Sequence, residues 1–292
     1  MSIDDSGNGT RGRAEAGPLN HQQLIITLFG FYGRSHGGAL PVAGLIRLMA
    51  DLGVDAPAVR SSISRLKKRG VLRSVKISGL SGYALAPGLE ETFREGDERI
   101  FGARRAALTD HWILAVFTVP EKQRHLRHQI RSGLIRMGFG AVAPGVWIAP
   151  EHLRGAAHAY MDRHDLSQYI DWFRGDYLGA REMSDAVGQW WDLAALEAQY
   201  ADFVARHAPV RERWIEDAGA AGDGERERAA FAAYITMVTE WRRLPYLDPG
   251  LPLELLPEGW HGMVAERLFG ELHRQLQAPA EVHARRVLAG AE

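Results

Sequence analysis

The chain has no cysteine among its 292 residues. It therefore cannot form disulfides, bind zinc or iron–sulfur clusters through thiolates, or use a cysteine nucleophile. Long apolar runs are also missing, since none approaches the roughly 18 residues that a membrane-spanning helix needs. The first 20 residues hold no apolar stretch of the secretory type. We expect a globular protein of the reducing cytoplasm with no membrane partner.

Acidic residues are absent from one basic stretch, residues 56–86, although the formal net charge of the whole chain is only −1. The stretch carries seven basic residues: Arg60, Arg65, Lys67, Lys68, Arg69, Arg73 and Lys76. A local basic segment on a nearly neutral protein predicts an anion-binding face, and nucleic acid is the usual partner. The alternative is an ordinary solvated helix face. The elements around the stretch favour the first interpretation.

Two helices joined by a short turn are predicted around the start of this stretch. Val42, Leu45 and Met49 share one helical stripe, which ends near Gly53. Asp55 is a suitable N-cap for a second helix that buries the stripe of Val59, Ile63 and Leu66 and ends at Gly70. A β pattern over residues 71–77 and 83–85, with a turn at 78–82, follows as a wing. We expect a winged helix-turn-helix over residues 20–100.

The outer face of the second helix fits the major groove of DNA, where hydroxyl and guanidinium groups reach base edges. The residues expected to read bases are Ser61, Ser64, Arg65 and Lys68. The residues expected to contact phosphates are Arg60, Lys67, Arg73 and Lys76. Lys67 and Arg69 could also be solvated helix residues without a role.

The rest of the chain predicts two further domains and an α+β fold. Residues 108–183 alternate strand and helix (strands at 112–119, 142–149 and 169–177), which is typical of a ferredoxin-like α/β domain. Residues 184–292 form a helical domain with helices at 190–207, 231–243, 263–276 and 279–288 and a loop at 217–228. Residues 1–19 are polar and aperiodic, and we expect a disordered tail.

Several residue runs resemble one known family. Residues 24–30 (LIITLFG) and 59–66 (VRSSISRL), together with Trp241-Arg242, residues 248–252 (DPGLP), 255–257 (LLP) and 260–262 (WHG), are similar to the phenylacetic-acid-degradation repressors, or PaaX-type regulators. The resemblance covers about residues 22–290. It implies a homodimeric winged-helix repressor, without enzymatic activity or cofactor, that binds a palindromic operator and is released by an aryl-CoA such as phenylacetyl-CoA.

Two sets of residues could bind such an effector. Arg124, Arg127 and Arg131 share one helix face and could grip the phosphates of CoA, because guanidinium groups match phosphate oxygens. Trp190 and Trp191 could line an aryl pocket. The alternatives are a solvated arginine face with inter-domain ion pairs, and tryptophans that belong to the core.

Other function classes have less support. The middle domain resembles the small ferredoxin-like nucleases of CRISPR systems, but residues 116–120 at the end of its first strand hold no carboxylate for a metal. Ser64 to Lys67 fits the short S-x-x-K pattern of acylating hydrolases without its partner motifs. His125 and His128 share a helix face but lack a third metal ligand. We therefore predict no catalytic or metal site, with a metal-dependent nuclease or a non-DNA acyl-CoA-binding protein as alternatives.

Overall fold

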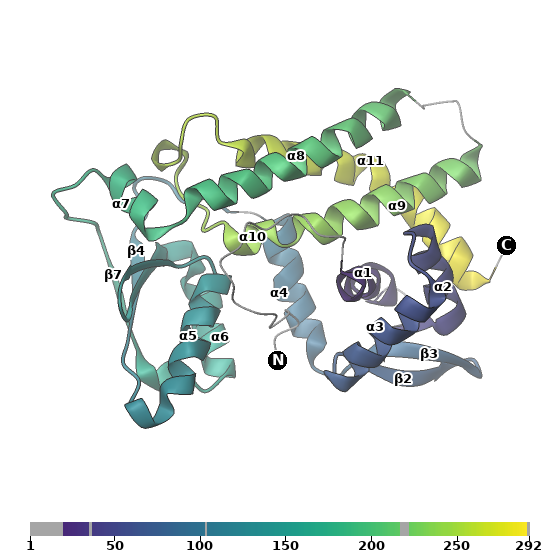
Figure 1. The fold of residues 1–292 in the computed structure, drawn as a ribbon, viewed down its shortest axis with the longest axis horizontal. Coiled ribbons are helices and arrows are strands. Elements are labelled where there is room, and N and C mark those ends of the chain that lie inside the picture. The colour runs from purple at the N-terminus through teal and green to yellow at the C-terminus, as the bar shows by residue number, and fades with distance from the viewer. Residues whose placement is uncertain (1–19, 35–36, 103, 217–221, 291–292) are drawn as a thin grey trace. The chain divides into compact units, whose positions relative to one another are not determined.

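The computed structural model describes residues 20–34, 37–102, 104–216 and 222–290 (Figure 1). The tail expected at residues 1–19 lies outside the described residues. The chain forms two compact units from non-contiguous segments. Unit 1 combines Met1–Gly96, His207–Glu240 and Leu268–Glu292, and unit 2 combines Asp97–Arg206 and Trp241–Arg267. Helices and two small antiparallel sheets make up both units, which confirms the predicted α+β class.

The first part of unit 1 is a winged helix. Its three-stranded sheet has the order β1-β3-β2, and the β2–β3 hairpin is the wing. The elements in chain order are α1 (His21–Leu28), a π-helical turn (Phe29–Gly33), β1 (Ala39–Pro41), α2 (Val42–Asp51), α3 (Ala56–Lys68), β2 (Leu72–Ile77), β3 (Leu80–Leu85) and α4 (Leu89–Phe101). The apolar stripes identified in the sequence form the core, since Leu45, Met49, Val59 and Leu66 are fully buried.

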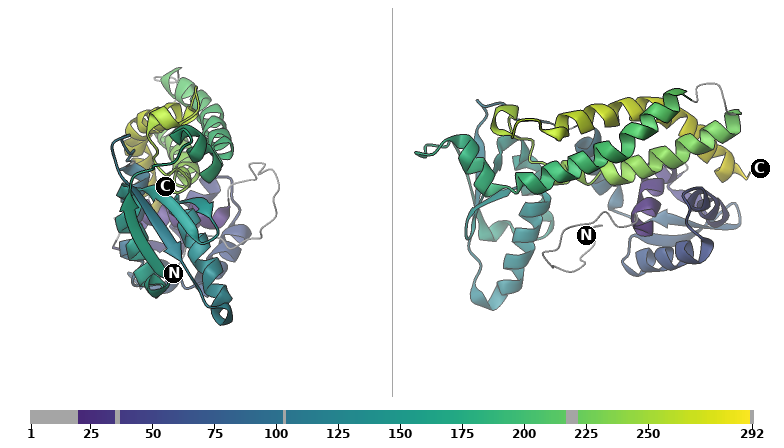
Figure 2. Two further views of the ribbon diagram at one scale, coloured as in Figure 1. Left: turned by 90° about the vertical axis from the view of Figure 1, so that its left-hand side faces the viewer. Right: turned by 45° about the horizontal axis from the view of Figure 1, so that its top comes forward.

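The remainder of unit 1 comes from parts of three long helices, α8 (Leu193–Glu216), α9 (Asp223–Trp241) and α11 (His261–Ala289). Unit 1 holds α8 from His207 onward, α9 up to Glu240 and α11 from Leu268 onward, and these parts run side by side in Figures 1 and 2. These helices pack directly on the winged helix. The Thr239 hydroxyl on α9 donates to the Thr27 hydroxyl on α1 at 2.9 Å, and a Cβ built on Gly44 of α2 would lie 2.9 Å from Leu288 on α11. The winged helix and the C-terminal helices thus share one core.

Unit 2 contains a ferredoxin-like domain. The elements are β4 (Trp112–Phe117), α5 (Arg124–Arg136), β5 (Gly140–Ala143), β6 (Val146–Pro150), α6 (Arg154–Arg163) and β7 (Ile170–Gly175). Short 3-10 turns precede α5, α6 and β7 at Glu121–Gln123, Glu151–Leu153 and Ser167–Tyr169. The sheet order β5-β6-β4-β7, all antiparallel, is that of a β-α-β-β-α-β ferredoxin-like fold. Ile113, Ile130, Leu134 and Met161 form the core between the sheet and the two helices.

Unit 2 is completed by helical segments. These are α7 (Met183–Trp190), the first part of α8, α10 (Leu244–Leu247) and a 3-10 turn at Leu253–Leu255. The predicted helix 190–207 is wrong at its start, because Trp190 ends α7. The Asp192 side chain then caps α8 by accepting a hydrogen bond from the Ala195 backbone N–H at 3.0 Å.

Three further predictions are wrong in detail. The strand expected at 142–149 is a hairpin, because Gly145 takes a φ of +80° and reverses the chain between β5 and β6. The loop expected at 217–228 is helical from Asp223 onward. The helices expected at 263–276 and 279–288 are one helix with Pro279 inside it. Burial of this part of the helix within unit 1 outweighs the backbone hydrogen bond that Pro279 cannot donate.

Candidate nucleic-acid interface

The helix α3 presents its polar residues to solvent and its apolar residues to the core. Val59, Ile63 and Leu66 are at most 2% exposed, whereas Ser61, Ser64 and Arg65 are exposed. The Asp55 side chain caps the helix by accepting a hydrogen bond from the Ala58 backbone N–H at 2.7 Å. All eight residues assigned to DNA contact are exposed: Arg60, Ser61, Ser64, Arg65, Lys67, Lys68, Arg73 and Lys76.

The wing is a tight hairpin with basic residues on its first strand. Ile77 pairs with Leu80, so the turn is only Ser78 and Gly79, both with positive φ. A two-residue turn of this kind follows the right-handed twist of the strands. Lys76 Nζ lies 3.4 Å from the Ser81 hydroxyl oxygen across the hairpin. The sequence had placed a five-residue turn here, and the hairpin is therefore longer and more regular than expected.

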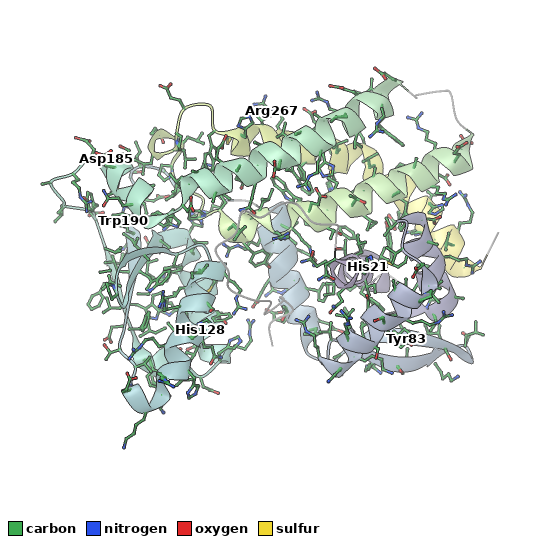
Figure 3. All side chains as sticks on the ribbon, viewed as in Figure 1. His21, Tyr83, His128, Asp185, Trp190 and Arg267 are labelled. Carbon is green, nitrogen blue, oxygen red and sulfur yellow. The ribbon has the colours of Figure 1, made fainter. Side chains whose placement is uncertain are left out.

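Tyr83 adds an aromatic ring to this surface that its sequence context does not predict. It lies on β3, half-buried, where Figure 3 labels it. Lys67 Nζ of α3 lies 5.7 Å from the centroid of its ring. This is cation–π distance, and it joins the helix to the wing. The alternation of residues 83–85 marked a strand, but nothing local to Tyr83 indicated that its ring faces α3.

The arginines proposed for effector binding lie on the exposed side of α5. Arg124 and Arg131 are exposed, and Arg127 donates to the Val119 carbonyl oxygen at 3.1 Å and pairs with Glu121 at 3.5 Å. His128, labelled in Figure 3, is also exposed on this helix. These side chains form an exposed cationic face of α5.

Trp190 and Trp191 are half-buried and packed in unit 2. The indole N–H of Trp191 donates to the Gly138 carbonyl oxygen at 2.8 Å. The ring of Trp112 lies 6.2 Å from that of Trp190 and 6.1 Å from that of Trp191, centroid to centroid. A cavity of about 30 Å³ is lined by Trp112 together with Leu108, Pro150, Met183 and Leu255. Neither tryptophan lines this cavity, and it is much smaller than the roughly 150 Å³ cavity known to hold a benzene ring.

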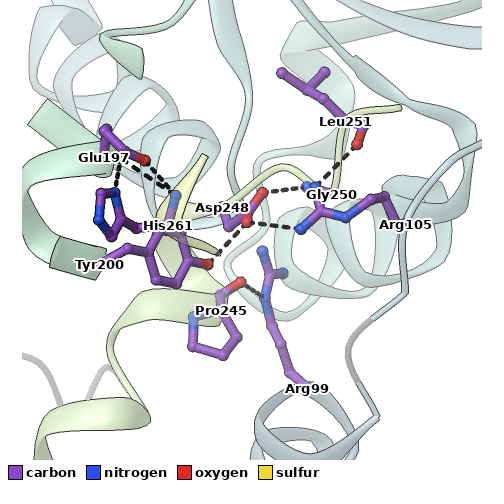
Figure 4. Close-up of polar contacts among 9 residues, drawn as sticks. All are labelled: Arg99, Arg105, Glu197, Tyr200, Pro245, Asp248, Gly250, Leu251 and His261. Atoms are coloured by element: carbon purple, nitrogen blue, oxygen red, sulfur yellow. Dashed lines mark hydrogen bonds and ion pairs between the residues drawn. The ribbon is translucent and has the colours of Figure 1, made fainter. Parts of the chain in front are cut away.

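The segment 248–252 is held by polar contacts within unit 2 (Figure 4). The Asp248 carboxylate accepts hydrogen bonds from the Tyr200 hydroxyl at 2.8 Å and the Gly250 backbone N–H at 2.7 Å, and it pairs with Arg105 at 3.4 Å. Arg105 also donates to the Leu251 carbonyl oxygen at 2.9 Å. Burial first, and then the Asp248 charge, raise the pKa of Tyr200. The polar groups of this segment form hydrogen bonds and ion pairs with one another, so the segment has a structural role in unit 2.

His152 packs against the same segment. A Cβ built on Gly250 would lie 3.2 Å from the His152 ring. Burial, assisted by the charges of Arg104 and Arg99, lowers the pKa of His152 to about 4. Its Nδ1 is buried and has no hydrogen-bond partner among the described residues. His152 is therefore neutral at physiological pH.

The described residues contain no group of three or more His, Asp or Glu side chains placed to hold a metal ion. Within the same ranges, none of the helices combines the length and the apolar character required to cross a bilayer.

Comparisons with known proteins find one family along the chain. Residues 20–88 match the family model of PaaX-like proteins, residues 105–187 that of the PaaX central Cas2-like domain, and residues 191–286 that of the PaaX-like C-terminal domain. The chain is 27% identical over 267 residues to a protein of Escherichia coli (strain K12) named transcriptional repressor PaaX, covering 90% of this chain and 82% of the relative.

A solved structure has a similar fold. An uncharacterized protein from Mycobacterium tuberculosis is 21% identical to this chain, with a TM-score of 0.56, and the likeness covers 91% of this chain and 99% of that one. At this identity the likeness concerns the fold alone.

Proposed function

Because the chain belongs to the PaaX-type family of transcriptional regulators, we propose that it is a repressor that binds operator DNA through α3 and the β2–β3 wing. One observation carries this proposal. All eight residues assigned to DNA contact lie exposed on the helix α3 and the β2–β3 hairpin, and no acidic residue lies between positions 56 and 86. Such a surface is attracted to the phosphate backbone and presents donors to base edges.

The residues divide into two roles. Ser61, Ser64, Arg65 and Lys68 lie on the face of α3 opposite its buried stripe, and they are proposed to contact base edges in the major groove. Arg60, Lys67, Arg73 and Lys76 flank that face or lie on the wing, and they are proposed to contact phosphates. A homodimer would place two copies of α3 on the half-sites of a palindromic operator, about one helical turn apart.

The double variant Arg65→Ala with Lys68→Ala tests this interface. We expect operator affinity to fall at least about tenfold, since one lost bidentate base contact is worth about 1–3 kcal/mol. The slope of log affinity against log salt should change little, because the residues proposed to contact phosphates, Arg60, Lys67, Arg73 and Lys76, all remain. The matched control is Arg274→Ala with Arg285→Ala, which removes two exposed charges from α11. Unchanged binding by the first variant would rule out the proposed surface.

The proposed effector is an aryl-CoA of aromatic catabolism, such as phenylacetyl-CoA. Its phosphates would bind the exposed guanidinium groups of Arg124, Arg127 and Arg131, and its aryl group would lie near Trp190 and Trp191. The ligand can release DNA only by binding the two states of the protein unequally. The cavity that Trp112 lines is too small for an aryl group and includes neither Trp190 nor Trp191, so aryl binding beside these tryptophans would require the surrounding side chains to move.

A gel shift with the DNA upstream of the protein's own gene, titrated with a panel of aryl-CoA thioesters, tests the effector. We expect phenylacetyl-CoA to release the DNA, and Arg124→Ala with Arg131→Ala to raise the concentration needed. Arg154→Ala with Arg174→Ala is the control for loss of two exposed charges in the same unit. Release that is identical in all three proteins would exclude the α5 arginines as effector contacts.

A further inference from the structure

Asp51 is the last residue of α2, and α3 begins five positions later at Ala56. Both oxygens of its carboxylate are engaged. Oδ1 pairs with Nε of Arg228 at 2.7 Å, and Oδ2 lies 2.7 Å from Nε2 of His283. The side chains of Asp51 and His283 are only 13% and 8% exposed, whereas Arg228 is 61% exposed. The end of the first helix of the helix-turn-helix is thus fixed by two separate donors.

The two donors belong to different C-terminal helices. Arg228 lies on α9 and His283 on α11, and an ion pair between Glu227 and Arg286 joins these helices beside the cluster. Both helices also contribute residues to unit 2: Trp241 at the end of α9, and residues 261–267 at the start of α11. Asp51 is therefore attached to two helices, each of which has residues in both units.

Apolar packing alone would not fix the orientation of α2 on the C-terminal helices. Gly44 meets Leu288 by shape only, and apolar contacts have no preferred direction. A carboxylate with a donor on each oxygen has a defined geometry. Burying such a group adds little net stability, because desolvation offsets the attraction. The cluster is therefore better explained by the geometry that it imposes than by the stability that it adds.

We propose that Asp51, Arg228 and His283 form a positioning cluster that sets the orientation of α3 on the operator. This inference rests on the proposed DNA-binding function. The three residues do not belong to the proposed DNA-contact surface, and they act through α2 and the turn that follows it. A shift of α3 affects contacts to base edges more than contacts to phosphates, because base contacts need defined donor geometry and the attraction to the backbone depends mainly on charge.

The ratio of affinity for the upstream DNA to affinity for random DNA of equal length measures this effect in the full-length protein. We expect Arg228→Gln to lower the ratio by about two- to fivefold, the range for an ion pair whose arginine is exposed, with random-DNA binding unchanged. Because the Arg228 side chain is exposed, we expect Arg228→Gln to fold normally, and an unchanged far-UV circular dichroism spectrum is the check. Asp51→Asn should lower the ratio further, and Asp51→Glu should restore part of it. If the cluster only stabilised the fold, the variants would contain more unfolded protein, and the apparent affinities for upstream and random DNA would fall together.

The matched control is Glu281→Gln on α11, the helix that carries His283. This variant removes the ion pair between Glu281 and Arg285, which lies within α11 and does not involve α2. We expect it to leave the ratio unchanged. If the wild-type protein does not distinguish the two DNAs, the proposed function fails. If the wild type distinguishes them and Arg228→Gln and Asp51→Asn keep its ratio, the positioning cluster is refuted and the proposed function stands.

Discussion

Lys67 Nζ lies 5.7 Å from the centroid of the Tyr83 ring, which joins α3 to the wing. Lys67 belongs to the exposed basic set and has a defined aromatic neighbour on another element. The contact reduces the freedom of a long side chain before DNA is bound, so less conformational entropy is lost on binding.

Replacing Tyr83 by Leu should weaken DNA binding. An exposed cation–π contact is worth about 0.5–1 kcal/mol, which corresponds to a two- to fivefold loss of affinity at most. Tyr83→Phe keeps the ring and should bind as the wild type does. Fluorescence anisotropy with labelled upstream DNA measures both. An equal loss in the two variants would show that the hydroxyl group, not the ring, matters.

Asp55 has opposing effects on folding and on DNA binding. Its carboxylate caps α3, but its negative charge adjoins a surface proposed to meet phosphates. Asp55→Ala should lower the free energy of unfolding by about 1 kcal/mol through loss of the cap. Asp55→Asn keeps the cap and should bind DNA more tightly at low salt. Urea unfolding and salt-dependent DNA titrations separate the two effects, and weaker binding by Asp55→Asn would contradict this account.

Gly140 should not tolerate a side chain. A Cβ there would lie 2.7 Å from the Trp191 ring and 2.9 Å from the Trp190 carbonyl oxygen. Gly140→Ala should destabilise the protein by about 1–3 kcal/mol through overpacking. The control is Gly155→Ala in α6, where the added Cβ meets nothing within 4 Å and helix propensity should add about 0.5–1 kcal/mol. Thermal melts should therefore shift in opposite directions.

The buried His152 predicts a loss of stability in acid. Its pKa is about 4 in the folded protein, against 6.5 when the chain is unfolded. Below about pH 6.5 the unfolded state binds a proton that the folded state does not, so stability falls as the pH drops from there toward 4. The urea midpoint should fall less between pH 7 and pH 5 in His152→Gln than in the wild type. Parallel curves would show that His152 does not contribute.

The sequence was sufficient where a pattern is local. The stripe of Val59, Ile63 and Leu66 and the cap at Asp55 lie within a few turns of one helix, so they predicted α3 and its exposed face. The acid-free stretch is likewise continuous in sequence, and it covers α3 and the wing. The strand–helix alternation likewise predicted the ferredoxin-like class. The β5–β6 hairpin was missed, because a single glycine with positive φ reverses an apolar run that otherwise has the character of one strand.

Contacts between distant segments could not be predicted in the same way. Asp51 and His283 are 232 positions apart, and the sequence around either residue gives no indication that the two side chains are in contact. The three domains predicted as continuous stretches of sequence also differ from the two compact units of the structure, because α9 and α11 complete the core of the winged helix. Pro279 predicts a helix boundary, because proline has no backbone N–H to donate inside a helix. The helix continues past it because the neighbouring Ala280 and Ala284 are buried in the core.

The fit of Gly44 under Leu288 has a practical consequence for protein engineering. Residues 20–100, expressed alone or grafted onto a foreign sensor module, would leave uncovered an apolar surface that the last turns of α11 now occupy. A soluble chimera would have to carry α9 and α11 along with the N-terminal segment, so the natural swapping unit is discontinuous in sequence.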